Sequence, residues 1–115
     1  MSEISKLSEN DSELIANYLL KKGIQSFGTN NFYSNIQRAA VNLGIIEDSN
    51  NVRSGVALIF SNEDYFKVVD KIWNFILNGF LAPGYNYYNP WFPHVHLTEK
   101  GKEYLKTIDK KNKES

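Results

Sequence analysis

The stretch from Ser61 to Leu105 constrains the fold more than any other part of the chain. It begins with a long amphipathic helix, predicted over 62–78, in which Ser61 and Asp64 have the spacing of a capping box. Gly79 predicts where this helix ends. An aromatic hairpin follows, and Thr98 is placed to cap a last helix over 100–108. The order of elements is therefore helix, glycine stop, hairpin and helix.

The helix predicted over 62–78 has a wide apolar surface, so we expect it to be covered on more than one side. Trp73 is predicted to be a buried core anchor whose replacement by Ala would cost roughly 3–5 kcal/mol. The residues at core spacing are Tyr65, Val69, Ile72, Trp73 and Ile76, and those that widen the surface are Phe66, Val68, Phe75 and Leu77. Lys67, Lys71, Asn74 and Asn78 form the remaining polar stripe.

Two further helices are predicted in the first half of the chain. One covers about 11–22, with Asn10 or Asp11 as its N-cap, and ends before Gly23. The other runs from near Asn31 to a C-cap at Gly44. Its apolar stripe is Phe32, Ile36, Ala39, Ala40 and Leu43.

The sheet is predicted to be small and antiparallel. Residues 45–55 show no periodicity, which indicates a solvated loop. The apolar, β-branched run 56–60 is interpreted as a short strand pairing with the hairpin, with a helix continuation as the alternative. The hairpin itself would consist of strands at 80–82 and 91–97, joined by a tip at 85–90. These segments predict three strands.

Composition limits the partners and compartments that the chain suits. Thirteen basic and thirteen acidic residues give a formal net charge of zero, which offers no global attraction to nucleic acid. The chain has no cysteine, which excludes disulfides and thiolate metal sites and fits a reducing compartment. The polar start lacks the apolar core of a signal peptide, and no run approaches the roughly 20 apolar residues of a membrane helix. We expect a cytoplasmic protein with a flexible leader (1–10), a single domain (11–109) and a frayed tail (110–115).

Two segments between Trp73 and Leu105 resemble winged-helix domains. WNFILNGFL closes the long helix into a strand, and VHLTEKGKEYL is similar to the segment that leaves the wing in MarR-type bacterial regulators. The resemblance implies an α+β, mainly α, winged-helix-like domain with three to four helices and a small antiparallel sheet carrying an aromatic wing. It also implies a non-enzymatic, DNA-binding transcriptional regulator. The chain departs from the pattern in two ways: residues 45–60 replace a short turn, and no Lys or Arg lies between Gly79 and Leu97.

If duplex DNA is the partner, the helix over 62–78 would read it. Lys and Asn side chains suit phosphate and base-edge contacts in the major groove. The predicted DNA contacts are Lys67, Lys71, Asn74 and Asn78, together with Arg53 from the preceding segment. The alternative is a solvated face whose lysines are offset by Glu63, Asp64 and Asp70.

The hairpin tip carries the other candidate contacts. Exposed aromatic rings could stack on bases or bury against a protein, whereas we expect Trp91 and Phe92 to fold back onto the long helix. The predicted wing contacts are Tyr85, Asn86, Tyr87, Tyr88 and Asn89. They support the alternative function, a protein-protein interaction or homodimerisation module that uses the aromatic wing.

Nothing in the sequence predicts catalysis, a cofactor or a metal. His94 and His96 alternate along one strand, but no third ligand stands at a recognisable spacing. No nucleophile, base and acid can be grouped, and no glycine-rich phosphate loop is present. The lysines that follow Thr98 are interspersed with acids, which is typical of a solvated helix face.

Overall fold

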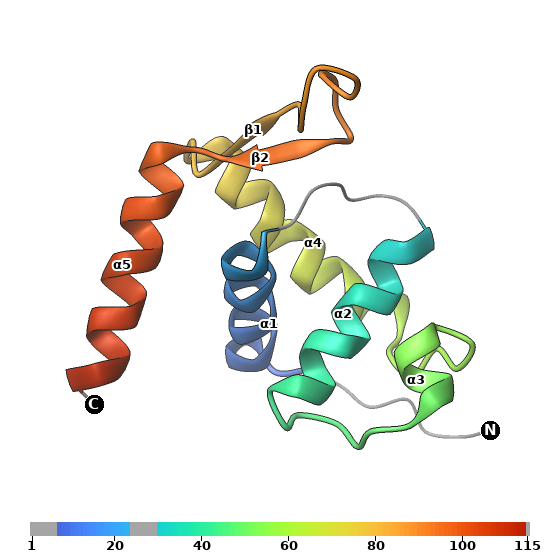
Figure 1. Cartoon of the computed structure of the whole chain (residues 1–115). Coiled ribbons are helices and arrows are strands. Elements are labelled where there is room, and N and C mark those ends of the chain that lie inside the picture. Colours follow the sequence, from blue (N-terminus) through green and yellow to red (C-terminus); the bar gives the residue numbers. More distant parts are fainter. Residues whose placement is uncertain (1–6, 24–29, 115) are drawn as a thin grey trace.

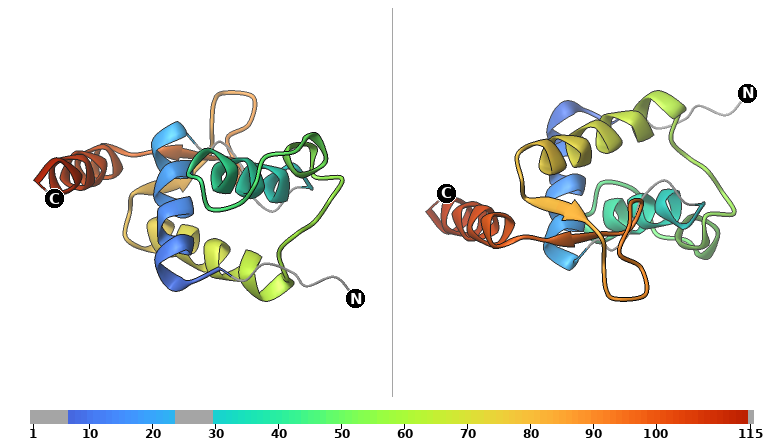
Figure 2. Two further views of the ribbon diagram at one scale, coloured as in Figure 1. Left: turned by 90° about the horizontal axis from the view of Figure 1, so that it is seen from below. Right: turned by 90° about the horizontal axis from the view of Figure 1, so that it is seen from above.

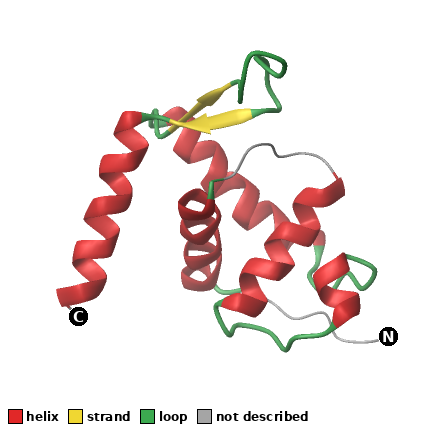
Figure 3. Cartoon of the chain, in the orientation of Figure 1, coloured by secondary structure: helices red, strands yellow, loops and turns green. Residues whose placement is uncertain are grey.

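The computed structural model describes residues 7–23 and 30–114 as a mainly helical chain with one small antiparallel sheet (Figures 1 and 3). This confirms the predicted α+β, mainly α, fold class. The elements are α1 (Glu9–Lys22), α2 (Asn30–Asn42), α3 (Asn50–Ser54), α4 (Asn62–Leu77), β1 (Leu81–Pro83), β2 (Val95–Leu97) and α5 (Glu99–Glu114). None of the helices in these two ranges is long and apolar enough to cross a bilayer.

The core lies where α1, α2, α4 and the hairpin meet. Helix α1 packs against both α4 and α2, while α3 packs against α2. The largest apolar side chains with almost no exposure are Ile15, Leu20, Ile36, Val68, Ile72, Leu81 and Val95. Figure 2 shows that α5 stands to one side of this bundle in both views and that the hairpin tip projects from it.

Local capping sets the helix boundaries. The predicted box at the start of α4 is present, because the Ser61 side chain accepts from the Asp64 N–H and the Asp64 carboxylate accepts from the Ser61 N–H. Helix α1 begins earlier than predicted, since Ser8 rather than Asn10 or Asp11 is its N-cap. Helix α5 continues to Glu114, through the residues expected to form a frayed tail.

The segment between α2 and α4 differs most from the prediction. Residues 50–54, expected in a loop, form α3, which Ser49 caps at one end and Gly55 at the other with φ +82°. Residues 56–60 do not form the predicted third strand: Phe60 makes an isolated bridge, and the described sheet has two strands, β1 and β2. The physical reason is a buried side chain, since the Ile59 N–H donates to Gln37 Oε1 at 3.0 Å instead of joining a ladder.

The hairpin, which we call the wing (residues 81–97), pairs Leu81 with Leu97 and Pro83 with Val95. The return strand is shorter than predicted, because residues 91–94 form a turn with a cis Phe92–Pro93 peptide bond. Thr98 leads from the wing into α5 and caps it, accepting from the Gly101 N–H at 3.0 Å.

Candidate protein-docking surface

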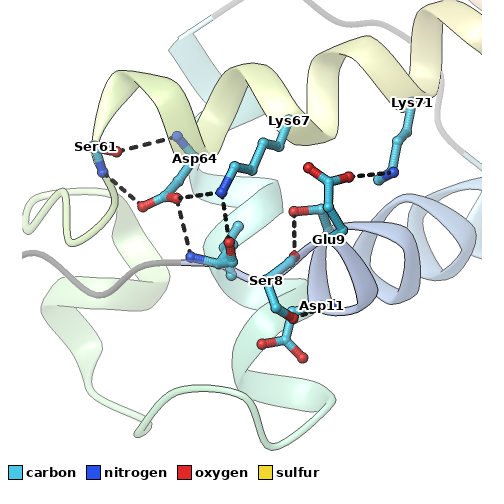
Figure 4. A network of polar contacts seen from close by, with 9 residues as sticks. Ser8, Glu9, Asp11, Ser61, Asp64, Lys67 and Lys71 are labelled. Atoms are coloured by element: carbon cyan, nitrogen blue, oxygen red, sulfur yellow. Dashed lines mark hydrogen bonds and ion pairs between the residues drawn. The ribbon is translucent and has the colours of Figure 1, made fainter.

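The two lysines predicted to contact DNA are directed at the first residue of α1 and at the chain just before it (Figure 4). Lys67 Nζ donates to the Leu7 carbonyl oxygen at 2.8 Å and lies 3.8 Å from Asp64 Oδ1. Lys71 Nζ lies 3.1 Å from Glu9 Oε2. Both ammonium groups therefore have partners within the domain.

Asp64 adds a further contact to this set of polar contacts between α4 and the start of α1, which we call the latch. Its side chain is 3% exposed, and Oδ1 accepts from the Leu7 N–H at 3.0 Å. The same carboxylate also caps α4, so one buried group fixes both the start of α4 and the chain that leads into α1. A buried carboxylate needs such hydrogen bonds and a nearby cation, which explains the position of Lys67.

The remaining predicted DNA contacts lie in two separate places. Asn74 and Asn78 are exposed near the end of α4, where Asn78 Nδ2 donates to the Asn74 carbonyl oxygen at 2.8 Å. Arg53 lies on α3, where it pairs with Asp48 at 2.5 Å and donates to Asn42 Oδ1 at 3.3 Å. The hydrogen bond with Asp48 raises the pKa of Arg53. The structure thus does not gather the five side chains into one cationic face.

The outward face of α4 is apolar and acidic instead. Its residues follow one another at helical spacing and are Phe66, Asp70, Trp73 and Leu77, which we call the seam. Phe66 is 54% exposed, Trp73 41% and Leu77 78%. Trp73 was predicted to be a buried core anchor, and this prediction was wrong. The sequence predicts an apolar surface wide enough to be covered on more than one side, but the outward side is covered only in part among the described residues, where Phe92 stacks on Trp73.

The wing tip is a hydrogen-bonded loop that presents two tyrosines. Asn86 Oδ1 accepts from the Tyr88 and Asn89 N–H groups, each at 2.9 Å, and Tyr85 N–H donates to the Asn89 carbonyl oxygen at 2.7 Å. Asn86 and Asn89 therefore shape the loop. Tyr87 and Tyr88 are 89% and 85% exposed, while Tyr85 is less exposed. Of the predicted wing contacts, Asn86 and Asn89 therefore hold the shape of the loop, and Tyr87 and Tyr88 are the rings most available for contact.

The seam and the wing are joined by a ring stack. The rings of Trp73 and Phe92 lie 5.4 Å apart with an interplanar angle of 30°. Phe92 folds back onto α4 as predicted, but Trp91 does not and remains 77% exposed. We use the name aromatic surface for the exposed large apolar side chains of the seam together with the most exposed rings of the wing. They are Phe66, Trp73, Leu77, Tyr87, Tyr88 and Trp91.

Charge around the aromatic surface is negative or absent. Glu63 and Asp70 are exposed on α4, and no ion pair of either is present in ranges 7–23 and 30–114. No Lys or Arg occurs in the sequence between Lys71 and Lys100. The surface therefore lacks the cations that phosphate contacts require.

The two histidines belong to the wing framework. His96 Nδ1 lies 2.7 Å from the Gly84 carbonyl oxygen. Among the residues that the structure describes, no group of three or more His, Asp or Glu side chains could hold a metal ion.

No family model matches this chain, and the searches of curated proteins and of solved structures gave no match either.

Proposed function

We propose that this domain is a protein-interaction module that docks a protein partner on the aromatic surface. The observation that carries the proposal is the outward face of α4, where Phe66, Trp73 and Leu77 are 54%, 41% and 78% exposed. Large exposed apolar side chains that gather on one face are typical of interaction sites.

The composition of the surface supports a protein partner. Tyr and Trp are enriched at protein interfaces because they contribute a large contact area with few rotatable bonds. The wing tip holds its two tyrosines on a loop fixed by Asn86, and Phe92 backs Trp73. Such preorganisation lowers the entropic cost of binding.

Duplex DNA is the second candidate, favoured by the order of the elements. The long helix α4 leads into the wing and then into α5, as the resemblance to winged-helix regulators implies. Against it stand the acidic Asp70 on the outward face and the internal pairing of Lys67 and Lys71.

Site-specific photo-cross-linking separates the two candidates. A photoreactive amino acid is placed at Leu77 or at Tyr88 in the full chain and irradiated in the cells that produce it. A third variant at Lys102, exposed on α5, is the matched control. We expect protein adducts from positions 77 and 88 that the control lacks.

Two results would oppose the proposal. Nuclease-sensitive adducts at Leu77 would favour DNA, which a steep loss of duplex affinity with rising salt would corroborate. The absence of position-specific protein adducts at both sites would remove the interaction proposal. Adducts with the mass of two chains would identify the partner as a second copy, the homodimer that the sequence left open.

A further inference from the structure

The seam has the geometry of one side of a helix–helix interface. Phe66, Asp70, Trp73 and Leu77 follow the positions i, i+4, i+7 and i+11 of α4. They form a straight row of roughly 16 Å, because each helical residue advances the axis by about 1.5 Å. Side chains at this spacing are the ones that a second helix packs against.

The seam is separate from the face of α4 that forms the core. The buried face consists of Asp64, Tyr65, Val68, Ile72 and Phe75. It packs against α1, α2 and β1, and the ring of Phe75 also lies 5.8 Å from the ring of Tyr104 on α5. The wing already reaches the seam at one point, where Phe92 stacks on Trp73, so a helix laid on the seam would lie beside this stack and leave the buried face of α4 in place.

Asp70 lies in the middle of this row, and it sets the chemistry of whatever covers the seam. Its two neighbours of opposite charge on α4, Lys67 and Lys71, are paired with groups at α1. Covering Asp70 with apolar side chains alone would desolvate a carboxylate without a counter-charge, which is strongly unfavourable. A partner that covers Phe66, Trp73 and Leu77 therefore needs a cation opposite Asp70.

Arginine meets this need best. Its planar guanidinium can bond both carboxylate oxygens while it stacks on a neighbouring aromatic face. Trp73 is one helical turn from Asp70 and keeps 41% of its surface exposed although Phe92 stacks on it. A single charged residue within an apolar helix seam also fixes the register of the two helices.

We infer that the seam binds an amphipathic helix of the partner whose apolar stripe is interrupted by one arginine or lysine, which pairs with Asp70. The inference rests on the proposed function and specifies its partner: an apolar helix with a central cation, oriented along α4.

Two designed helical peptides test this inference. Both are side-chain-stapled, carry the same leucines at alternating three- and four-residue spacing, and differ only at one central position, which is Arg in one and Glu in the other. Each is labelled and titrated with the full chain by fluorescence anisotropy. We expect the Arg peptide to bind at least about tenfold more tightly than the Glu peptide. Leu77→Ala should weaken the binding of the Arg peptide.

Substitutions of Asp70 supply the decisive comparison. D70N should reduce the preference for the Arg peptide to within about threefold, and D70K should reverse it in favour of the Glu peptide. Asp70 is exposed and has no ion-pair partner among the residues described, so both variants should fold, which circular dichroism checks. E103K on α5, also at an exposed acid, is the matched control and should leave the preference unchanged.

Three results would overturn the inference: equal affinity of the two peptides for the unmodified chain, no binding of either at millimolar concentration, or a preference that persists in D70N. Its failure is distinguishable from that of the proposed function. Protein adducts at Leu77 and Tyr88 together with charge-indifferent peptides would retain the interaction surface and reject the cationic helix. Without position-specific adducts, the proposed function itself would fail.

Discussion

The substitution Lys67→Met separates a structural role of this lysine from a role in DNA binding. Methionine keeps most of the apolar stem and removes the ammonium group. In the structure that group donates to the Leu7 carbonyl oxygen at 2.8 Å and lies 3.8 Å from the buried Asp64 carboxylate (Figure 4). The substitution therefore removes a charged hydrogen-bond donor from the latch between α1 and α4.

The expected magnitude follows from these contacts. A hydrogen bond to a charged group contributes roughly 1.5–3 kcal/mol. The Lys67 side chain is 36% exposed, so solvent screening favours the lower end of that range. We expect Lys67→Met to lower the free energy of unfolding by about 1.5–2 kcal/mol.

Lys102→Met is the matched control. Lys102 pairs with Glu99 at 3.0 Å across the surface of α5, where the two side chains are 53% and 89% exposed. Removing such a pair should change the free energy of unfolding by no more than about 0.5 kcal/mol. Urea unfolding, followed by circular dichroism, measures the stability of both variants. The midpoint urea concentration of Lys67→Met should lie on the order of 1 M below that of Lys102→Met.

A structural role of the Lys67 ammonium group is refuted if Lys67→Met unfolds at the same urea concentration as Lys102→Met. This role is also refuted if Lys67→Met retains its stability but loses duplex affinity and flattens the salt dependence, since a phosphate contact has that signature. Either outcome would show that the ammonium group is available to a ligand.

Three further predictions concern the framework that holds the aromatic surface. Gln37 donates to the Val52 carbonyl oxygen and accepts from both the Ile59 N–H and the Tyr65 O–H. Leucine would leave these three groups unpaired, so Gln37→Leu should lower the free energy of unfolding, measured in urea, by roughly 3–5 kcal/mol. Burial raises the pKa of Tyr65, so the native state favours the neutral phenol. The contribution of this phenol to the free energy of unfolding is complete below about pH 10 and is lost as the pH rises through the folded-state pKa. Tyr65→Phe removes the hydroxyl that donates to Gln37 Oε1 at 2.8 Å, so it should cost about 1 kcal/mol at neutral pH; because it also removes the titrating phenol, it should show a smaller alkaline loss in the same assay. Gly101→Ala should lower thermal stability by about 1–3 kcal/mol, because a Cβ there would collide with the Phe80 carbonyl oxygen and lie 2.6 Å from Leu97 Cδ1.

Local chemistry made much of the helical framework predictable. The capping box of Ser61 and Asp64 acts within one turn, so its residues are visible in the sequence. Gly101 belongs to the segment VHLTEKGKEYL that resembles MarR-type regulators, and the structure gives a physical reason for a glycine there: α5 passes so close to the Phe80 carbonyl oxygen that a Cβ has no room.

Contacts between distant residues explain what the sequence did not predict. The run 56–60 has strand-like composition, but Gln37 on α2 takes the Ile59 N–H. Helix α3 has only five residues, too few to show a period, although Ser49 and Gly55 were available as its caps. In both places the outcome depends on side chains outside the window in which a pattern can be recognised.

The faces of α4 show the same limit at the candidate site. Periodicity predicted a helix with apolar residues on more than one side, but it could not assign a cover to each side. The lysine stripe was equally ambiguous, because Leu7 and Glu9, which engage it, lie about 60 residues away in sequence. The exposure of the lysines is thus set by where α1 docks, and the partial cover of Trp73 by where the wing places Phe92.

The docking of α1 also connects the charge balance of the chain to its proposed function. A chain with equal numbers of cations and anions can mix them on every surface or can separate them between surfaces. In α4 the cations Lys67 and Lys71 turn toward α1, while Glu63 and Asp70 remain on the outward side. The net charge of zero therefore conceals an outward face of α4 on which the exposed charged side chains are Glu63 and Asp70, beside the large apolar side chains of the seam. Such a face disfavours phosphate and favours a cationic protein helix, and it is this separation of charges, rather than composition or element order, that distinguishes the two candidate partners.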